Sequence, residues 1–147
     1  AKPVPVNPYT LRSRSASAFM WVSLAGPASN LLLALAAGVL LRFRIVPWAA
    51  STSTILPSAA EFLFTFLTIN LLLMLFNLIP LSPLDGEKVL SYLLPPRLSQ
   101  AYLRLQPYGP LILLALLFVL PLVGVDIIDW IISPALIGLQ KLILGVA

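Results

Sequence analysis

The chain is 147 residues long, about one domain, with a net charge of +4; 60% of its residues are hydrophobic and only 10% are charged. An average soluble domain is roughly 25% charged, so this composition excludes an ordinary soluble fold and indicates a membrane protein. The sequence contains no cysteine and no histidine, which excludes a disulfide framework, a cysteine metal cluster and the commonest general base.

Residues 1–17 form a polar, proline-rich start in which Pro3, Pro5 and Pro8 lie close together. Because proline fixes its own backbone and restricts the residue before it, this stretch favours an extended or polyproline conformation and forbids a helix. The alternating valines suit a short edge strand at the membrane surface, whereas the polar residues suit a flexible tail. Both alternatives remain open, and we expect a short extended segment here.

Long apolar runs then predict an all-α integral membrane protein with three to four transmembrane helices, built as a single membrane domain over residues 1–147. About 20 apolar residues suffice to cross roughly 30 Å of hydrocarbon. The last run contains Pro134 and several polar residues, so it is either a span interrupted at that proline or a helix lying in the interface. The expected spans are residues 18–41, 55–79, 107–125 and about 127–146.

A short amphipathic stretch separates the second and third of these runs. In residues 97–106, Leu98, Tyr102 and Leu105 fall on one side of a helix, and the arginines can extend toward lipid headgroups. This spacing predicts a short interfacial helix that anchors the chain.

Two amides share one face of the second span. Asn70 and Asn77 lie seven residues apart, which is about two helical turns. A polar stripe inside a membrane implies a polar partner, and a hydrogen bond to a neighbouring helix is the expected one, contributing about 0.6 kcal/mol on average.

The second span ends in a disrupted stretch, residues 77–86, which read Asn-Leu-Ile-Pro-Leu-Ser-Pro-Leu-Asp-Gly. Pro80 and Pro83 lack a backbone N–H and clash with the preceding turn, so the helix must kink or unwind. Broken backbone at membrane depth is tolerated only where protein or a water-filled cavity surrounds it, and an ionisable residue there is a functional-site candidate. Asp85 is therefore the first candidate, although a solvated turn residue is the alternative.

The basic residues predict an orientation. With four spans, both termini and the region 82–106 fall on the more positive side, which the positive-inside rule assigns to the cytoplasm. If the last segment does not span, Lys141 changes side and the balance still holds. The scattered charges indicate headgroup contact with a lipid bilayer and no nucleic-acid partner. The more positive side carries Lys2, Arg12, Arg14, Lys88, Arg97, Arg104 and Lys141, and the other side carries Arg42 and Arg44.

Four blocks of the sequence resemble one known family. Residues 77–86 resemble the Asn-x-x-Pro-x-x-x-Leu-Asp-Gly motif of the site-2 protease family, the intramembrane zinc metalloproteases of peptidase family M50. Residues 1–8 are similar to the segment after the first catalytic helix in compact members without a PDZ domain. Residues 25–30, Ala-Gly-Pro-Ala-Ser-Asn, resemble the Gly-Pro-x-x-Asn helix start, and residues 93–97, with Tyr102 and Tyr108, are similar to the C-terminal region.

The resemblance implies a zinc cofactor and a site. In that family a His-Glu-x-x-His helix supplies two zinc ligands and a general base, and the aspartate of the Asp-Gly motif supplies the third ligand. By resemblance, Asp85 is the third zinc ligand, and Asn77, Pro80 and Gly86 line the site. A transmembrane protein would be the substrate of intramembrane proteolysis, and a bacterial or archaeal plasma membrane would be the location.

The sequence departs from the pattern because it has no histidine and hence no His-Glu-x-x-His helix, so no catalytic residue is assigned within this chain. Two readings follow. Either the chain is the C-terminal part of a protease whose catalytic helix lies upstream, which the start at Ala1 inside a family block favours, or it is a non-catalytic M50-like transmembrane subunit with a structural role in a larger complex. A channel or transporter would need more polar pore-lining residues.

Overall fold

The computed structural model describes residues 16–48 and 57–146, and in this part of the chain it contains helices and no strand, which confirms the all-α class. The extended segment expected over residues 1–17 lies outside the described residues, except that Ala16 and Ser17 already belong to the first helix. In chain order the elements are α2 (Ala16–Arg42), α3 (Ala59–Asn77), α4 (Asp85–Leu93), α5 (Pro96–Leu103), η1 (Gln106–Tyr108), α6 (Gly109–Leu114), η2 (Ala115–Val119), α7 (Leu120–Leu122) and α8 (Ile127–Leu144).

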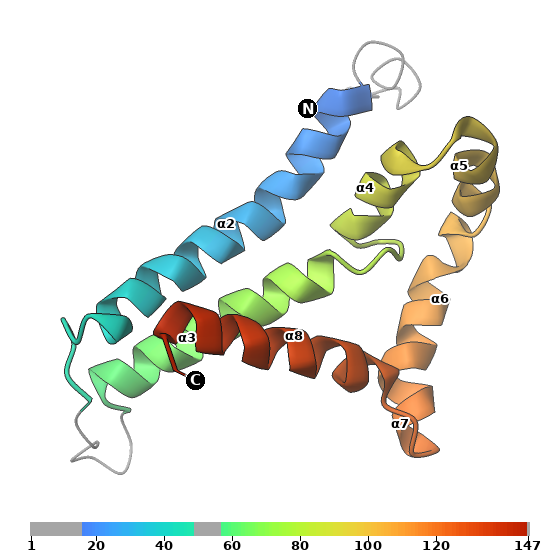
Figure 1. Ribbon diagram of the computed structural model, residues 1–147. Coiled ribbons are helices and arrows are strands. Elements are labelled where there is room, and N and C mark those ends of the chain that lie inside the picture. Colours follow the sequence, from blue (N-terminus) through green and yellow to red (C-terminus); the bar gives the residue numbers. More distant parts are fainter. Residues whose placement is uncertain (1–15, 49–56, 147) are drawn as a thin grey trace, which may run out of the picture.

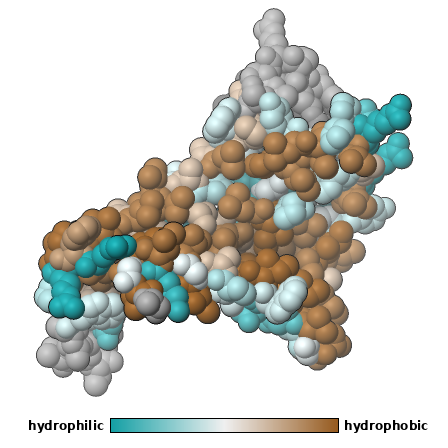
Figure 2. Space-filling model, viewed as in Figure 1, coloured by the Kyte–Doolittle hydropathy of each residue, from teal (hydrophilic) through white to brown (hydrophobic). Residues whose placement is uncertain are grey.

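Three stretches of the described chain are long and apolar enough to cross a membrane: Ala18–Arg42, Ala59–Asn77 and Pro96–Leu122. The third begins earlier than the expected span over residues 107–125 and includes the residues expected to form an interfacial helix. Helical turns continue through this region because backbone bonds such as Leu105 N–H to the Tyr102 carbonyl, 3.0 Å, join α5 to η1. Figure 2 shows the surface of the whole molecule, and hydrophobic residues cover most of the visible face, as expected for helices that cross a membrane.

Helix α3 begins with a capping box. The Ser58 hydroxyl accepts from the Glu61 N–H at 3.2 Å, and the Glu61 carboxylate accepts from the Ser58 N–H at 2.7 Å. This exchange satisfies two backbone donors at the start of the helix, which is why an acidic residue is tolerated there. Residues 55 and 56, where the span was expected to begin, lie outside the described residues.

The core lies between α2 and α3, which run side by side in opposite directions (Figure 1). Small residues on α2 allow close packing against the leucines of α3. Helix α8 shares this core, because its residues Leu136, Leu139 and Ile143 pack against it. The buried cluster comprises Ala34, Ala37, Leu67, Leu71 and Met74.

Helix α8 lies across α3 (Figure 1) and is held by polar contacts at its C-terminal end. Gln140 donates to the Thr68 hydroxyl at 2.8 Å, and the Arg42 guanidinium donates to the Leu142 carbonyl at 3.2 Å. The helix interruption that was predicted at Pro134 is not found, since α8 continues through this proline. A proline inside an otherwise apolar helix removes only one backbone bond, and contacts with neighbouring helices offset that loss.

Proline shapes the helix before α8 differently. The α-helical backbone widens to a single π turn at Ala115–Val119, which ends two residues before Pro121. The ring of Pro121 clashes with the carbonyl four residues earlier and offers no N–H, so a wider turn relieves the crowding. The helix then ends at Leu122, three residues before the end of the expected span at 125.

Candidate functional site

The disrupted stretch predicted from the prolines is present in the structure. Helix α3 ends at Asn77 and α4 begins at Asp85, and between them the backbone forms turns with bonds such as Leu84 N–H to the Leu81 carbonyl, 2.8 Å. The Ser82–Pro83 peptide is cis. The break therefore places a carboxylate in the first turn of a new helix, where the helix dipole favours a negative charge.

The Asp85 carboxylate lies between its own helix and α2. One oxygen, Oδ1, accepts from the Lys88 ammonium at 2.9 Å. The other, Oδ2, faces Gly26 of α2, because a Cβ atom added there would lie 3.4 Å from it. The Lys88 ammonium also lies 5.9 Å from the centre of the Phe19 ring. The two carboxylate oxygens therefore face different surroundings.

The position of Gly26 shows which part of α2 this carboxylate faces. Gly26 follows Ala18, where the membrane-crossing stretch of α2 starts, by eight residues, which corresponds to about 12 Å along a helix. Since roughly 30 Å of hydrocarbon separates the two ends of a membrane-crossing helix, Asp85 faces the inner part of this apolar stretch and not its end. The side chain is still 29% exposed in this chain, which leaves the carboxylate accessible.

Close backbone contacts fix the start of α4. A Cβ atom on Gly86 would collide with the carbonyl oxygens of Leu78 and Ile79, so only glycine lets the helix begin this near the broken stretch. From the other side, the Tyr102 hydroxyl of α5 donates to the Pro80 carbonyl at 2.7 Å. Sequence reasoning gave Tyr102 no hydrogen-bonding role, because the contact joins residues 22 positions apart.

The two asparagines of α3 bond within their own helix. Asn77 donates to the Leu73 carbonyl and Asn70 to the Phe66 carbonyl, each at 2.8 Å and four residues back. The interhelical hydrogen bond that was expected for these two amides is made by another residue of α3: the Thr68 hydroxyl accepts from Gln140 of α8. The structure thus brings Pro80 and Gly86 together with Asp85 in one segment, while the amide of Asn77 is turned toward its own helix.

The described residues supply one candidate zinc ligand and not a complete set. Within 16–48 and 57–146, no three side chains among Asp, Glu, Cys and His lie close enough to hold a metal ion. Glu87 is buried, but it lies two positions after Asp85 and therefore projects from another side of α4. A carboxylate suits one corner of a tetrahedral zinc site, so any further ligands must come from outside these residues.

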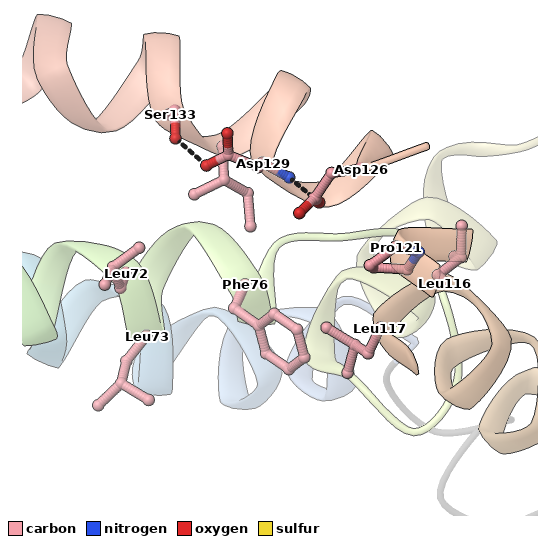
Figure 3. Close-up of a pocket in the computed structure, with 10 residues that line it drawn as sticks. Leu72, Leu73, Phe76, Leu116, Leu117, Pro121, Asp126, Asp129 and Ser133 are labelled. Atoms are coloured by element: carbon pink, nitrogen blue, oxygen red, sulfur yellow. Dashed lines mark hydrogen bonds between the residues drawn. The ribbon is translucent and has the colours of Figure 1, made fainter. Parts of the chain in front are cut away.

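A cavity of about 390 Å³ lies apart from this carboxylate, between α3, the helix that ends at Leu122, and α8 (Figure 3). Its walls are mostly apolar, and Asp126, Asp129 and Ser133 provide its polar side. Asp126 accepts from the Asp129 N–H at 2.9 Å, and the Ser133 hydroxyl donates to the Asp129 carboxylate. Asp126 caps α8, a role that an aspartate just before an apolar helical run could have indicated, whereas Ser133 and Asp129 bond to each other within the helix. No residue of the 77–86 stretch lines the cavity.

The fold and the site together define a class: an integral membrane protein of helices, with a carboxylate at a helix break facing a neighbouring span. The family model for peptidase family M50 matches residues 43–120, which include the whole broken stretch. The chain therefore belongs to peptidase family M50, the site-2 protease family, as its motifs indicated.

One curated relative can be compared directly. The protein named "Putative zinc metalloprotease YwhC" from Bacillus subtilis (strain 168) is 34% identical over 122 residues, which cover 83% of this chain and 55% of that protein. The chain thus spans about half the length of this relative. No solved structure matches the chain.

Proposed function

We propose that this chain is the C-terminal part of an intramembrane zinc metalloprotease of the site-2 protease type, in which Asp85 supplies one zinc ligand. The observation that carries the proposal is the position of Asp85. It lies inside the region matched to the M50 family, beside the apolar stretch of α2, with Oδ2 facing Gly26 while Oδ1 bonds to Lys88.

The remaining ligands would come from a segment outside these 147 residues, since the sequence contains no histidine. When bound, zinc in such an enzyme activates a water and polarises the scissile carbonyl of a transmembrane protein substrate. The residues of this chain hold the carboxylate in place: Gly86 lets α4 start against the broken stretch, and Tyr102 holds the Pro80 carbonyl. Asn77 and Pro80 would line the site near the substrate backbone.

The alternative is a non-catalytic M50-like subunit that packs against partners in a membrane complex. One observation favours it, namely that Asp85 already has a cationic partner in Lys88 at 2.9 Å. A carboxylate neutralised in this way needs no metal to be stable at membrane depth.

We also propose that the start of α2 lies on the cytoplasmic side of a bacterial or archaeal plasma membrane. Helix α4 packs against α2, with Lys88 near Phe19, so the basic residues of α4 and α5 belong to this end. The Arg42 guanidinium donates to the Leu142 carbonyl, so the end of α8 lies near the end of α2. This contact supports the alternative in which the last segment does not span and Lys141 changes side. With Lys141 counted on the other side, the side proposed as cytoplasmic still carries more basic residues, six against three, as the positive-inside rule requires.

Zinc content tests the proposed function. The whole protein, expressed from its own reading frame and purified in detergent, is expected to retain zinc, and Asp85→Ala is expected to lose most of it. Asp129→Ala is the matched control, because it removes an exposed carboxylate that faces the cavity. Equal zinc in wild type and Asp85→Ala would contradict ligation by Asp85. A metal-free protein that co-purifies with partners in fixed stoichiometry would instead support the subunit.

A further inference from the structure

We propose that Lys88 is a positioning residue for Asp85: it holds Oδ1 so that Oδ2 alone is presented toward α2. This inference rests on the proposed function, because it assigns a task to Lys88 in holding a zinc ligand. It concerns a side chain that the family motif in residues 77–86 does not include.

The ion pair is specific in its geometry. Lys88 is the fourth residue of α4 and Asp85 the first, so the two side chains share one face of the helix. Their side chains are 34% and 29% exposed, so this pair is screened less than one on an open surface. A lysine near a helix N-terminus is disfavoured by the helix dipole, so the bond to Asp85 offsets an unfavourable position.

Helix α2 complements this pair residue by residue. Phe19 and Gly26 lie seven residues apart on α2 and therefore project from the same face. Phe19 places its ring 5.9 Å from the Lys88 ammonium, a cation–π distance, and Gly26 leaves space beside Oδ2 of Asp85. One face of α2 thus contacts both members of the pair, and the ammonium is held from two directions.

For a bound metal, the ion pair would leave Asp85 as a ligand with a fixed orientation that binds through one oxygen, Oδ2. A carboxylate with one oxygen engaged by an ammonium cannot rotate freely, so the other oxygen keeps its direction. Partners of this kind orient metal-binding carboxylates, and their removal typically lowers metal affinity by roughly 10-fold to 100-fold. A lysine that instead competed with the metal for Asp85 would have the opposite effect, because its removal would strengthen binding.

The experiment measures the zinc dissociation constant of the whole protein by chelator competition. Lys88→Met is expected to weaken zinc binding by roughly 10-fold or more. Lys88→Arg is expected to restore most of the affinity, because it returns a cationic donor. Phe19→Leu is expected to have a smaller effect in the same direction. Lys141→Met is the control, since it removes an exposed lysine on α8.

The outcomes separate this inference from the proposed function. If Asp85→Asn loses zinc while Lys88→Met binds it unchanged or more tightly, the role of Lys88 is overturned and the proposed function stands. If Asp85→Asn binds zinc as wild type does, the proposed function itself fails. Thermal unfolding of each metal-free variant shows whether lost affinity follows from lost fold, and Phe19→Leu and Lys88→Arg keep the test decisive if Lys88→Met is unstable.

Discussion

Asp85 and Asp126 stand at similar places in the chain but in different surroundings. Each follows a break in the helical backbone, Asp85 as the first residue of α4 and Asp126 as the cap of α8. The Asp126 carboxylate accepts from the Asp129 N–H of its own helix, whereas Oδ2 of Asp85 faces Gly26 of a different helix. A carboxylate at a helix start therefore becomes a candidate ligand only where packing turns it toward another element.

The largest expected effect comes from the contact that places α4. Gly86→Ala should lower the free energy of unfolding by about 1–3 kcal/mol, because the added methyl group collides with two backbone carbonyls that cannot rotate away. Unfolding of the detergent-solubilised protein by a denaturing detergent measures this change.

Gly138→Ala is the matched control, because a methyl group on Gly138 of α8 would meet no atom within 4 Å. It should be neutral or stabilise the helix by roughly 0.5–1 kcal/mol. If the two variants behaved alike, the start of α4 would not depend on its approach to the broken stretch, and the contrast between Asp85 and Asp126 would lose its structural basis.

The second prediction concerns the local carboxylate. Asp126→Ala removes the cap of α8 and should cost about 1 kcal/mol of stability, while zinc binding by the whole protein stays unchanged. The same unfolding and zinc measurements check both parts. Loss of zinc in Asp126→Ala would place this carboxylate in the metal site and reverse the comparison.

The sequence was sufficient where the signal is local. Pro80 and Pro83 forbid a continuous helix by their own covalent structure, so the break before Asp85 could be predicted from them. The membrane class follows from composition, and its all-α character follows from the length of the apolar runs. The Asp85–Lys88 ion pair could also have been predicted, because side chains three residues apart meet on a helix, but only with α4 known to begin at Asp85.

Contacts between helices could not be predicted in the same way. Nothing in the residues around Gly26 or Phe19 indicates that they face Asp85 and Lys88, since that depends on how α2 and α4 pack. The amide of Asn77 shows a related limit: a backbone carbonyl four residues back competed with any partner on another helix and accepted the bond.

The smallest effect is expected at the hydrogen bond between Tyr102 and the broken stretch. Tyr102→Phe removes the hydroxyl that donates to the Pro80 carbonyl at 2.7 Å and leaves the ring in place. Hydrogen bonds between membrane helices contribute about 0.6 kcal/mol on average, so the loss of stability should be of that order. Tyr108→Phe is the control, since Tyr108 is exposed. A loss no larger than that of the control would mean that Gly86 and its backbone contacts hold the segment without help from α5. A loss well above 1 kcal/mol would show that Tyr102 governs the whole stretch, in which case the position of Asp85 depends on α5 as much as on α2.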